Sequence, residues 1–147
     1  MSEIYLGNPN LKKANTPIQF SAEQIEEFLK CKNNPVYFAQ KYVKIVSLDE
    51  GLVPFQPYKF QEKLIKRFHK NRFNICKMPR QTGKSTTVVS YLLHYAVFND
   101  SVNIGILANK AATARELLGR LQTAYENLPK WMQQGVLVWN RGSLELE

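Results

Sequence analysis

Cysteine and long apolar runs are both scarce in this chain, and each scarcity excludes a class of protein. The 147 residues include two cysteines, Cys31 and Cys76, which lack metal-ligand spacing. Cys76 lies in a segment that we expect to be a buried strand, so we expect two reduced, unpaired thiols. No apolar run approaches the ~20 residues of a membrane span, and residues 1–7 lack the basic start of a secretory signal. We therefore expect a cytoplasmic protein that does not enter a membrane.

Acidic residues are scarce in the middle of the chain. Residues 51–100 carry nine Lys and Arg against Glu62 and Asp100, a net charge of +7 out of +8 for the whole chain. Residues 1–50 balance to zero and residues 101–147 carry +1. This distribution favours a polyanionic partner, either a nucleotide or a nucleic acid. A solvated basic helix face is the alternative, and charge by itself does not decide between the two.

The composition is that of one globular domain, with 44% hydrophobic and 22% charged residues. Two helix starts stand out near the beginning of the chain. Ser21 and Gln24 have the spacing of a capping box, and Asn34 followed by Pro35 marks a second start. The predicted divisions are an irregular arm, a helical lead-in and the body of the domain, at residues 1–20, 21–53 and 54–147.

A Gly-Lys-Ser sequence lies between an expected strand and an expected helix. The loop, residues 78–86, reads Met-Pro-Arg-Gln-Thr-Gly-Lys-Ser-Thr, with apolar residues 73–77 before it and an apolar helix over about 84–98 after it. This context predicts a phosphate-binding loop, because the loop amides and the helix N-terminus point positive charge at an anion. Lys84 would then reach the β- and γ-phosphates of a nucleotide, and the Ser85 hydroxyl would bind Mg²⁺.

The loop departs from the usual Gly-x-x-x-x-Gly-Lys-[Ser/Thr] pattern. It has Met78 where the pattern has glycine, and it contains a cation, Arg80. The alternative interpretation is a chance Gly-Lys-Ser at an ordinary helix start. The strand expected before the loop and the long apolar helix expected after it favour a nucleotide-binding loop.

An amphipathic basic helix leads into this region. Phe60, Leu64 and Phe68 recur every fourth residue, and lysine and arginine take the other faces. Gln56 and Gln61 lie near the start of the helix. Each amide offers a donor and an acceptor together, which matches the edge of adenine. A glutamine is more often an ordinary surface residue, so adenine recognition stays open on these residues alone.

The segments after the loop complete an α/β pattern. Residues 102–108 are expected to form a second buried strand, followed by a helix over about 111–128 that ends at Pro129. Strand–helix–strand–helix order predicts a parallel sheet with helices on its faces. Residues 136–146 differ, since two short apolar runs around Asn-Arg-Gly-Ser predict a β-hairpin.

Three runs of the sequence carry a family resemblance. They are Pro-Phe-Gln-Pro-Tyr-Lys-Phe-Gln, Asn-Ile-Cys-Lys-Met-Pro-Arg-Gln-Thr-Gly-Lys-Ser-Thr and Ile-Gly-Ile-Leu-Ala-Asn-Lys, at 54–61, 74–86 and 104–110. Together they resemble the large terminase subunit of tailed, myovirus-like bacteriophages, over roughly residues 5–147. The resemblance implies an ASCE/RecA-like P-loop NTPase with an incomplete parallel sheet, an N-terminal helical lead-in and a C-terminal β-hairpin. It also implies the N-terminal part of a packaging ATPase, which moves viral DNA through the portal into a prohead.

The resemblance also implies roles for individual residues. Gln56 and Gln61 match the adenine-recognition glutamines, and Lys84 and Ser85 match the phosphate and magnesium residues. Arg80 matches an arginine that contacts the γ-phosphate in cis, where a fixed cation stabilises developing charge. The remaining residues of the implied ATP-binding loop are Gln81, Thr82, Gly83 and Thr86, of which the first two would serve equally well only to shape the loop.

The implied cofactors are ATP and Mg²⁺. The implied partners are double-stranded DNA, the portal protein, the small terminase subunit and further copies in a ring, in the host cytoplasm at the prohead portal. The family's Walker-B strand with its Asp-Glu, and its nuclease domain, have no counterpart here, because the final Leu-Glu-Leu-Glu belongs to the hairpin. We therefore expect a fragment or a separately encoded piece that binds ATP weakly and hydrolyses little or none.

Two alternatives remain. A helicase-like ATPase fragment would share the upstream glutamine, the phosphate loop and the following strand. A truncated, non-catalytic module would only bind DNA or a motor partner through its basic helix. Arg80 within the loop and Met78 in place of glycine favour the terminase over the helicase.

Overall fold

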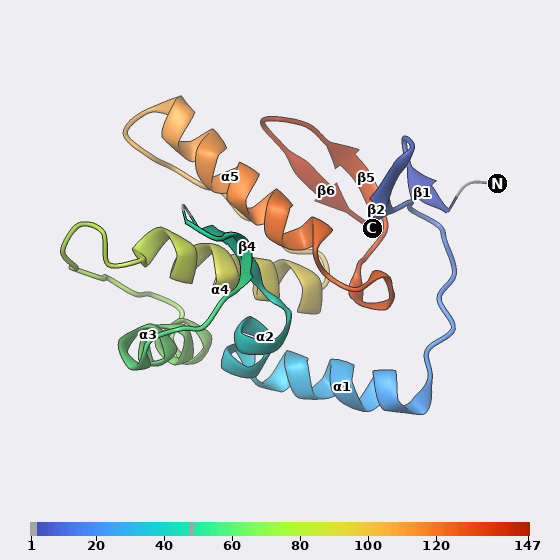
Figure 1. The fold of residues 1–147 in the computed structure, drawn as a ribbon, viewed down its shortest axis with the longest axis horizontal. Helices are drawn as coiled ribbons and strands as arrows, with labels where there is room; N and C mark the ends of the chain where they lie inside the picture. The colour runs from blue at the N-terminus through green and yellow to red at the C-terminus, as the bar shows by residue number, and fades with distance from the viewer. Residues whose placement is uncertain (1–2, 48) are drawn as a thin grey trace.

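The computed structural model describes residues 3–47 and 49–147, whose helices and strands form a mixed α/β fold (Figure 1). The strands pair as three antiparallel hairpins, β1–β2, β3–β4 and β5–β6. No helix in these two ranges is long and apolar enough to cross a membrane. The strands are β1 Ile4–Tyr5, β2 Asn8–Lys12, β3 Lys44–Ser47, β4 Gly51–Pro54, β5 Val136–Trp139 and β6 Leu144–Leu146. The helices are α1 Ala22–Asn33, α2 Pro35–Tyr42, α3 Lys59–Lys70, α4 Lys84–Phe98, α5 Ala111–Glu126 and the short 3₁₀ helix η1 Lys130–Met132.

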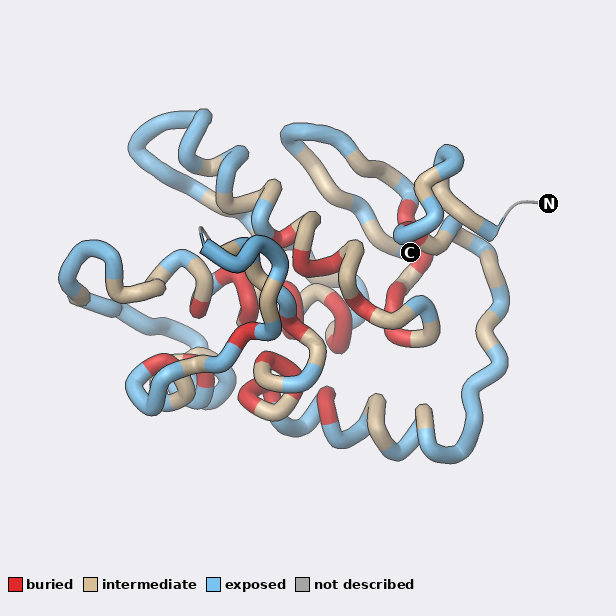
Figure 2. Tube along the Cα trace, in the orientation of Figure 1, coloured by how far each residue is buried: buried red, intermediate tan, exposed pale blue. Residues whose placement is uncertain are grey.

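Helix α4 lies at the centre of the fold and packs against α2, α3 and α5. The buried segments in Figure 2 concentrate on α4 and the elements around it. Phe38 of α2 is fully buried there, with its ring centroid 5.3 Å from that of Phe98 on α4. Tyr125 of α5 is also fully buried. This apolar packing stabilises the fold, because it removes large side chains from water.

The structure confirms the caps that the sequence predicts for the first two helices. The Gln24 N–H donates to Ser21 Oγ over 3.2 Å, and the Ser21 N–H donates to Gln24 Oε1 over 3.0 Å. This pair completes a capping box at the start of α1. Asn34 Oδ1 accepts from the Tyr37 N–H over 3.0 Å, and Pro35 takes the first position of α2. Each cap satisfies an N–H group that a helix start leaves unpaired.

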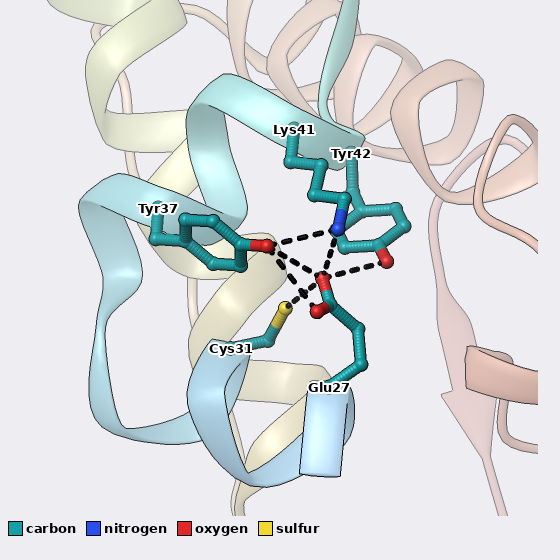
Figure 3. Close-up of polar contacts among 5 residues, drawn as sticks. All are labelled: Glu27, Cys31, Tyr37, Lys41 and Tyr42. Carbon is teal, nitrogen blue, oxygen red and sulfur yellow. Dashed lines mark hydrogen bonds and ion pairs between the residues drawn. The ribbon is translucent and has the colours of Figure 1, made fainter. Parts of the chain in front are cut away.

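The Glu27 carboxylate links α1 to α2 (Figure 3). It accepts hydrogen bonds from Lys41 Nζ over 2.7 Å, from the Tyr42 hydroxyl over 2.9 Å and from the Tyr37 hydroxyl over 3.0 Å. The bond from Lys41 is the main reason that the pKa of Glu27 falls to about 2. Cys31 lies beside this cluster, and burial raises the pKa of its thiol to about 12. The cluster therefore holds a charged carboxylate and a protonated thiol at neutral pH.

His94 of α4 is a buried imidazole next to this helix pair. It is 2% exposed, and its Nε2 lies 3.0 Å from the Cys31 carbonyl oxygen. A carbonyl only accepts, so Nε2 carries the proton, and Nδ1 has no hydrogen-bond partner. Burial lowers the pKa of His94 to about 4. The imidazole is therefore neutral in the folded protein at neutral pH.

Acid should destabilise the fold in two separate pH ranges. The unfolded chain protonates His94 near its ordinary pKa of 6.5, whereas the folded chain does so only near 4. The free energy of unfolding should therefore fall by about 3 kcal/mol as the pH drops through that range. Glu27 should add a second loss between about pH 4.5 and 2, because folding lowers its pKa. Urea unfolding followed by circular dichroism at stepped pH measures both losses.

The matched variant for this experiment is His94→Gln. A glutamine amide can still donate to the Cys31 carbonyl but does not titrate. The variant should lose the pH dependence between 6.5 and 4 and keep the lower one. A variant with the same slope as the wild type in the upper range would contradict the assignment to His94.

The segment predicted as an irregular arm contains two short paired strands. Strands β1 and β2 pair as a hairpin, and the side chain of Gln133 holds β2 against the end of α5. Gln133 Nε2 donates to the Asn10 and Leu128 carbonyls, each over 2.9 Å, and to the Tyr125 carbonyl over 3.3 Å. Its Oε1 accepts from the Lys12 N–H over 3.1 Å. The partner that orders the hairpin is thus more than a hundred residues away in sequence.

The predicted parallel sheet is not seen within the described ranges. Residues 73–77 and 102–108 are neither helical nor part of a strand, and neither segment belongs to a sheet. Phe73 and Leu107 are exposed, and so is Cys76, which the sequence predicts to be buried. An extended segment becomes a strand only when a neighbour pairs its N–H and C=O groups, and the described residues provide none here. The mixed α/β class is confirmed, whereas the P-loop parallel sheet stays a prediction.

The remaining predicted elements agree with the structure. The helix after the loop, the helix that follows residues 102–108 and the C-terminal hairpin are α4, α5 and β5–β6. Strands β3 and β4 pair as an antiparallel hairpin between α2 and α3.

Candidate functional site

Residues 78–83 form a loop that closes around the Lys84 side chain. Lys84 Nζ donates to the backbone carbonyls of Met78 over 2.9 Å and of Pro79 over 2.7 Å. Thr82 Oγ1 donates to the same Pro79 carbonyl over 3.1 Å. The ammonium group is therefore held within the turn of main chain instead of extending into solvent.

Two residues of the loop have a left-handed backbone. Gln81 has a φ of 58° and Gly83 a φ of 71°. Glycine adopts this conformation without steric cost. A Cβ at position 83 would also lie 2.5 Å from Nε2 of Gln61. Gly83 thus lets the loop pass close to Gln61 and turn directly into α4.

Helix α4 starts at the loop, and its first turn is open. Gly83 is the N-cap and provides no side-chain hydrogen bond, so the first N–H groups of the helix remain available to an anion. Ser85 is exposed on this turn, and Thr86 is half-buried. Thr87 stabilises this turn, since its Oγ1 donates a hydrogen bond to the Gly83 carbonyl over 2.9 Å. The helix start therefore combines free amides, an exposed hydroxyl and the positive end of the helix dipole.

The cations at the loop have no carboxylate partner. The ion pairs in the described part of the chain are Lys41–Glu27 and Arg120–Glu116, which lie on other helices. Arg80 is exposed. The residues that the structure describes also contain no group of three or more His, Cys, Asp and Glu able to hold a metal ion. The site is a concentration of positive charge, which suits an anionic ligand.

The two glutamines predicted at adenine lie in different environments. Gln56 is exposed, whereas Gln61 is 3% exposed. Gln61 Oε1 accepts from the Tyr58 N–H over 2.8 Å at the start of α3, and its Nε2 donates to the Gly83 carbonyl over 3.4 Å. Gln61 therefore joins α3 to the loop, with its amide directed at protein groups. Its recognition of adenine stays a prediction.

Helix α3 buries a different face from the one that its sequence predicts. The four-residue spacing of Phe60, Leu64 and Phe68 predicts the buried stripe. Instead Gln61 and Ile65 are buried, while Phe60 is 45% exposed and Leu64 is half-buried. The sequence signal for the buried face was the apolar Ile65, which lies four positions after Gln61 and therefore on the same side of the helix. The outer face lines an open hollow of about 230 Å³ whose residues are Phe60, Lys63, Leu64, Arg67 and Met78.

The structure brings most of the predicted loop residues together. Thr82, Gly83 and Lys84 lie in one hydrogen-bonded unit with Gln61 behind them. Arg80 and Ser85 lie exposed in the loop and on the first helical turn. No protein-family model matches the chain. A functional assignment therefore depends on the residues and geometry of this loop.

Proposed function

We propose that this chain is the ATP-binding portion of a viral DNA-packaging terminase large subunit. In full length, such a subunit hydrolyses ATP to move genomic DNA into a prohead and cleaves that DNA. The observation that supports the proposal is the Lys84 ammonium held inside a loop at the uncapped start of α4. Two neutral carbonyls now accept its hydrogen bonds, and phosphate oxygens would be stronger acceptors because they are charged.

The residues at the loop fit ATP with Mg²⁺. Lys84 and the first N–H groups of α4 would bind the β- and γ-phosphates, and the exposed Ser85 hydroxyl would bind the metal. When bound, ATP with Mg²⁺ would supply the phosphoryl group and partly neutralise its charge. Arg80 would extend from the loop to the γ-phosphate. The remaining residues, Gln81, Thr82, Gly83 and Thr86, would hold the loop in shape, and Gln56 would recognise adenine together with Gln61.

The partners belong to the same proposal. Double-stranded DNA suits the basic excess of residues 51–100. The portal protein, the small terminase subunit and further copies of the chain in a ring follow from the family resemblance. These partners would assemble at the prohead portal in the host cytoplasm.

Arg80→Ala should weaken the binding of ATP but not the binding of ADP. If the guanidinium contacts the γ-phosphate, its loss should weaken Mg-ATP binding by about 10-fold and leave Mg-ADP binding unchanged. Isothermal titration calorimetry with each nucleotide measures this difference. Arg120→Ala is the matched control, because Arg120 is an exposed arginine on α5, paired with Glu116.

Two outcomes would count against the proposal. Equal losses for ATP and ADP would show that Arg80 acts on the loop as a whole. A wild-type chain that binds neither nucleotide would contradict the proposed function itself.

A further inference from the structure

The hollow on α3 has apolar residues at its floor and cationic residues at its edge. Four of its residues, at positions 60, 63, 64 and 67, have the spacing of a single helical stripe. Phe60 and Leu64 provide the floor, and Lys63 and Arg67 the charges. Met78 closes the hollow from the loop side. The Met78 carbonyl also accepts from Lys84 Nζ, so the hollow adjoins the phosphate loop without being part of it.

An exposed aromatic ring adjoins the hollow, and another follows the end of α3. The Tyr58 ring stacks on Phe60, with 5.8 Å between ring centroids and 11° between ring planes. Tyr58 is 71% exposed, so this pair presents aromatic surface to solvent. Phe73 follows shortly after α3 and is also exposed, with the Arg72 guanidinium 5.3 Å from its ring centroid. Large aromatic rings exposed next to cations are unusual for a surface that has no binding partner.

Charge on α3 is of one sign on the exposed side. The one acid of this helix, Glu62, accepts a hydrogen bond from Gln40 Nε2 of α2 over 2.9 Å. The Glu62 carboxylate is therefore occupied by a hydrogen bond within the protein. The hollow is left with Lys63 and Arg67, and the rest of the helix adds Lys59, Lys66 and Lys70. A ligand that covers the hollow must combine an apolar flat surface with negative charge.

We propose that this hollow is a contact site for single-stranded nucleic acid. A base stacks on the Phe60 ring and lies against Leu64 and Met78, while the adjoining phosphates pair with Lys63 and Arg67. Single strands expose base faces for stacking on aromatic side chains, whereas a duplex keeps them inside its own stack. The inference rests on the proposed function for its class of partner, DNA, and adds a contact for single-stranded segments at this face to the double-stranded DNA named there.

The test is fluorescence anisotropy with a short labelled oligo(dT) strand and a duplex of equal length. The wild type should bind the single strand more tightly than the duplex. Phe60→Ala and Arg67→Gln should each weaken single-strand binding by about 10-fold. Phe20→Ala and Arg120→Gln should leave it unchanged. Phe20 is 44% exposed, against 45% for Phe60, and both control residues lie outside the hollow.

Lys84→Ala distinguishes this inference from the proposed function. Single-strand binding should survive in Lys84→Ala, whereas ATP binding should not, so either claim can fail alone. Three results would overturn the inference. The first is equal affinity of the wild type for the duplex and the single strand. The second is a Phe60→Ala variant that no longer binds Mg-ATP but still binds oligo(dT). The third is self-association of the wild-type chain that Phe60→Ala abolishes. Circular dichroism of every variant checks that the fold is retained.

Discussion

Replacing Lys84 with alanine should lower the affinity for Mg-ATP by about 100-fold, because each hydrogen bond from a charged donor to a phosphate oxygen contributes strongly. The ammonium already lies within the loop, where Met78 and Pro79 hold it through their carbonyls. It therefore need not be ordered when ATP binds, and little of its interaction energy is spent on ordering. Isothermal titration calorimetry with Mg-ATP measures the loss.

The control for this variant is Lys77→Ala. Lys77 is an exposed lysine one residue before the loop, so it contributes the same net charge without the loop geometry. Its replacement should change ATP affinity much less. Lys84→Ala should also keep its stability, because water can satisfy the freed carbonyl of Pro79, where the bond to Lys84 is exposed. Undiminished Mg-ATP binding by Lys84→Ala would rule out a phosphate-binding role for the loop.

Gln133→Leu should lower the free energy of unfolding by about 3 kcal/mol, the largest stability loss that we expect from one substitution of similar volume. Leucine fills the space but leaves the Asn10 and Leu128 carbonyls and the Lys12 N–H without their Gln133 partner, whereas the Tyr125 carbonyl keeps its bond from the Leu128 N–H. Buried backbone groups without partners are costly. Thermal unfolding should shift by roughly 10 °C, and urea unfolding should show a lower midpoint with an unchanged slope.

Gln134→Leu provides the comparison. This neighbouring glutamine is only half-buried and donates one hydrogen bond, to the Val97 carbonyl over 2.9 Å. Its replacement should cost clearly less. Similar losses for both variants would show that apolar packing around η1, and not the hydrogen bonds of Gln133, holds the N-terminal hairpin in place.

Features that depend on neighbouring residues were predictable from the sequence. The Ser21–Gln24 capping box and the Asn34 cap are local hydrogen bonds, and the structure contains both. The N-terminal hairpin was not predictable, because its order depends on Gln133, far along the chain. The parallel sheet stays a prediction for a related reason. Local sequence can make residues 73–77 extended, but only a paired neighbour makes them a strand.

The candidate site divides in the same way. The lysine, the glycine and the open helix start follow from the Gly-Lys-Ser sequence between two predicted elements. The face of α3 does not, because two faces of the helix carry apolar residues, one with Phe60 and Leu64 and the other with Ile65. Packing against α2 and α4 decides between them. The same packing turns Gln61 inward, toward Gly83.

The contrast between the two cysteines has a practical consequence for probing the loop. Cys31 is fully buried with its thiol pKa raised to about 12, whereas Cys76 is exposed two residues before Met78. Thiol-directed reagents need an accessible sulfur that can ionise. A maleimide dye will thus attach to the native sequence at Cys76 alone. The natural chain carries its own attachment point for a fluorescent reporter, beside the loop whose occupancy is to be followed.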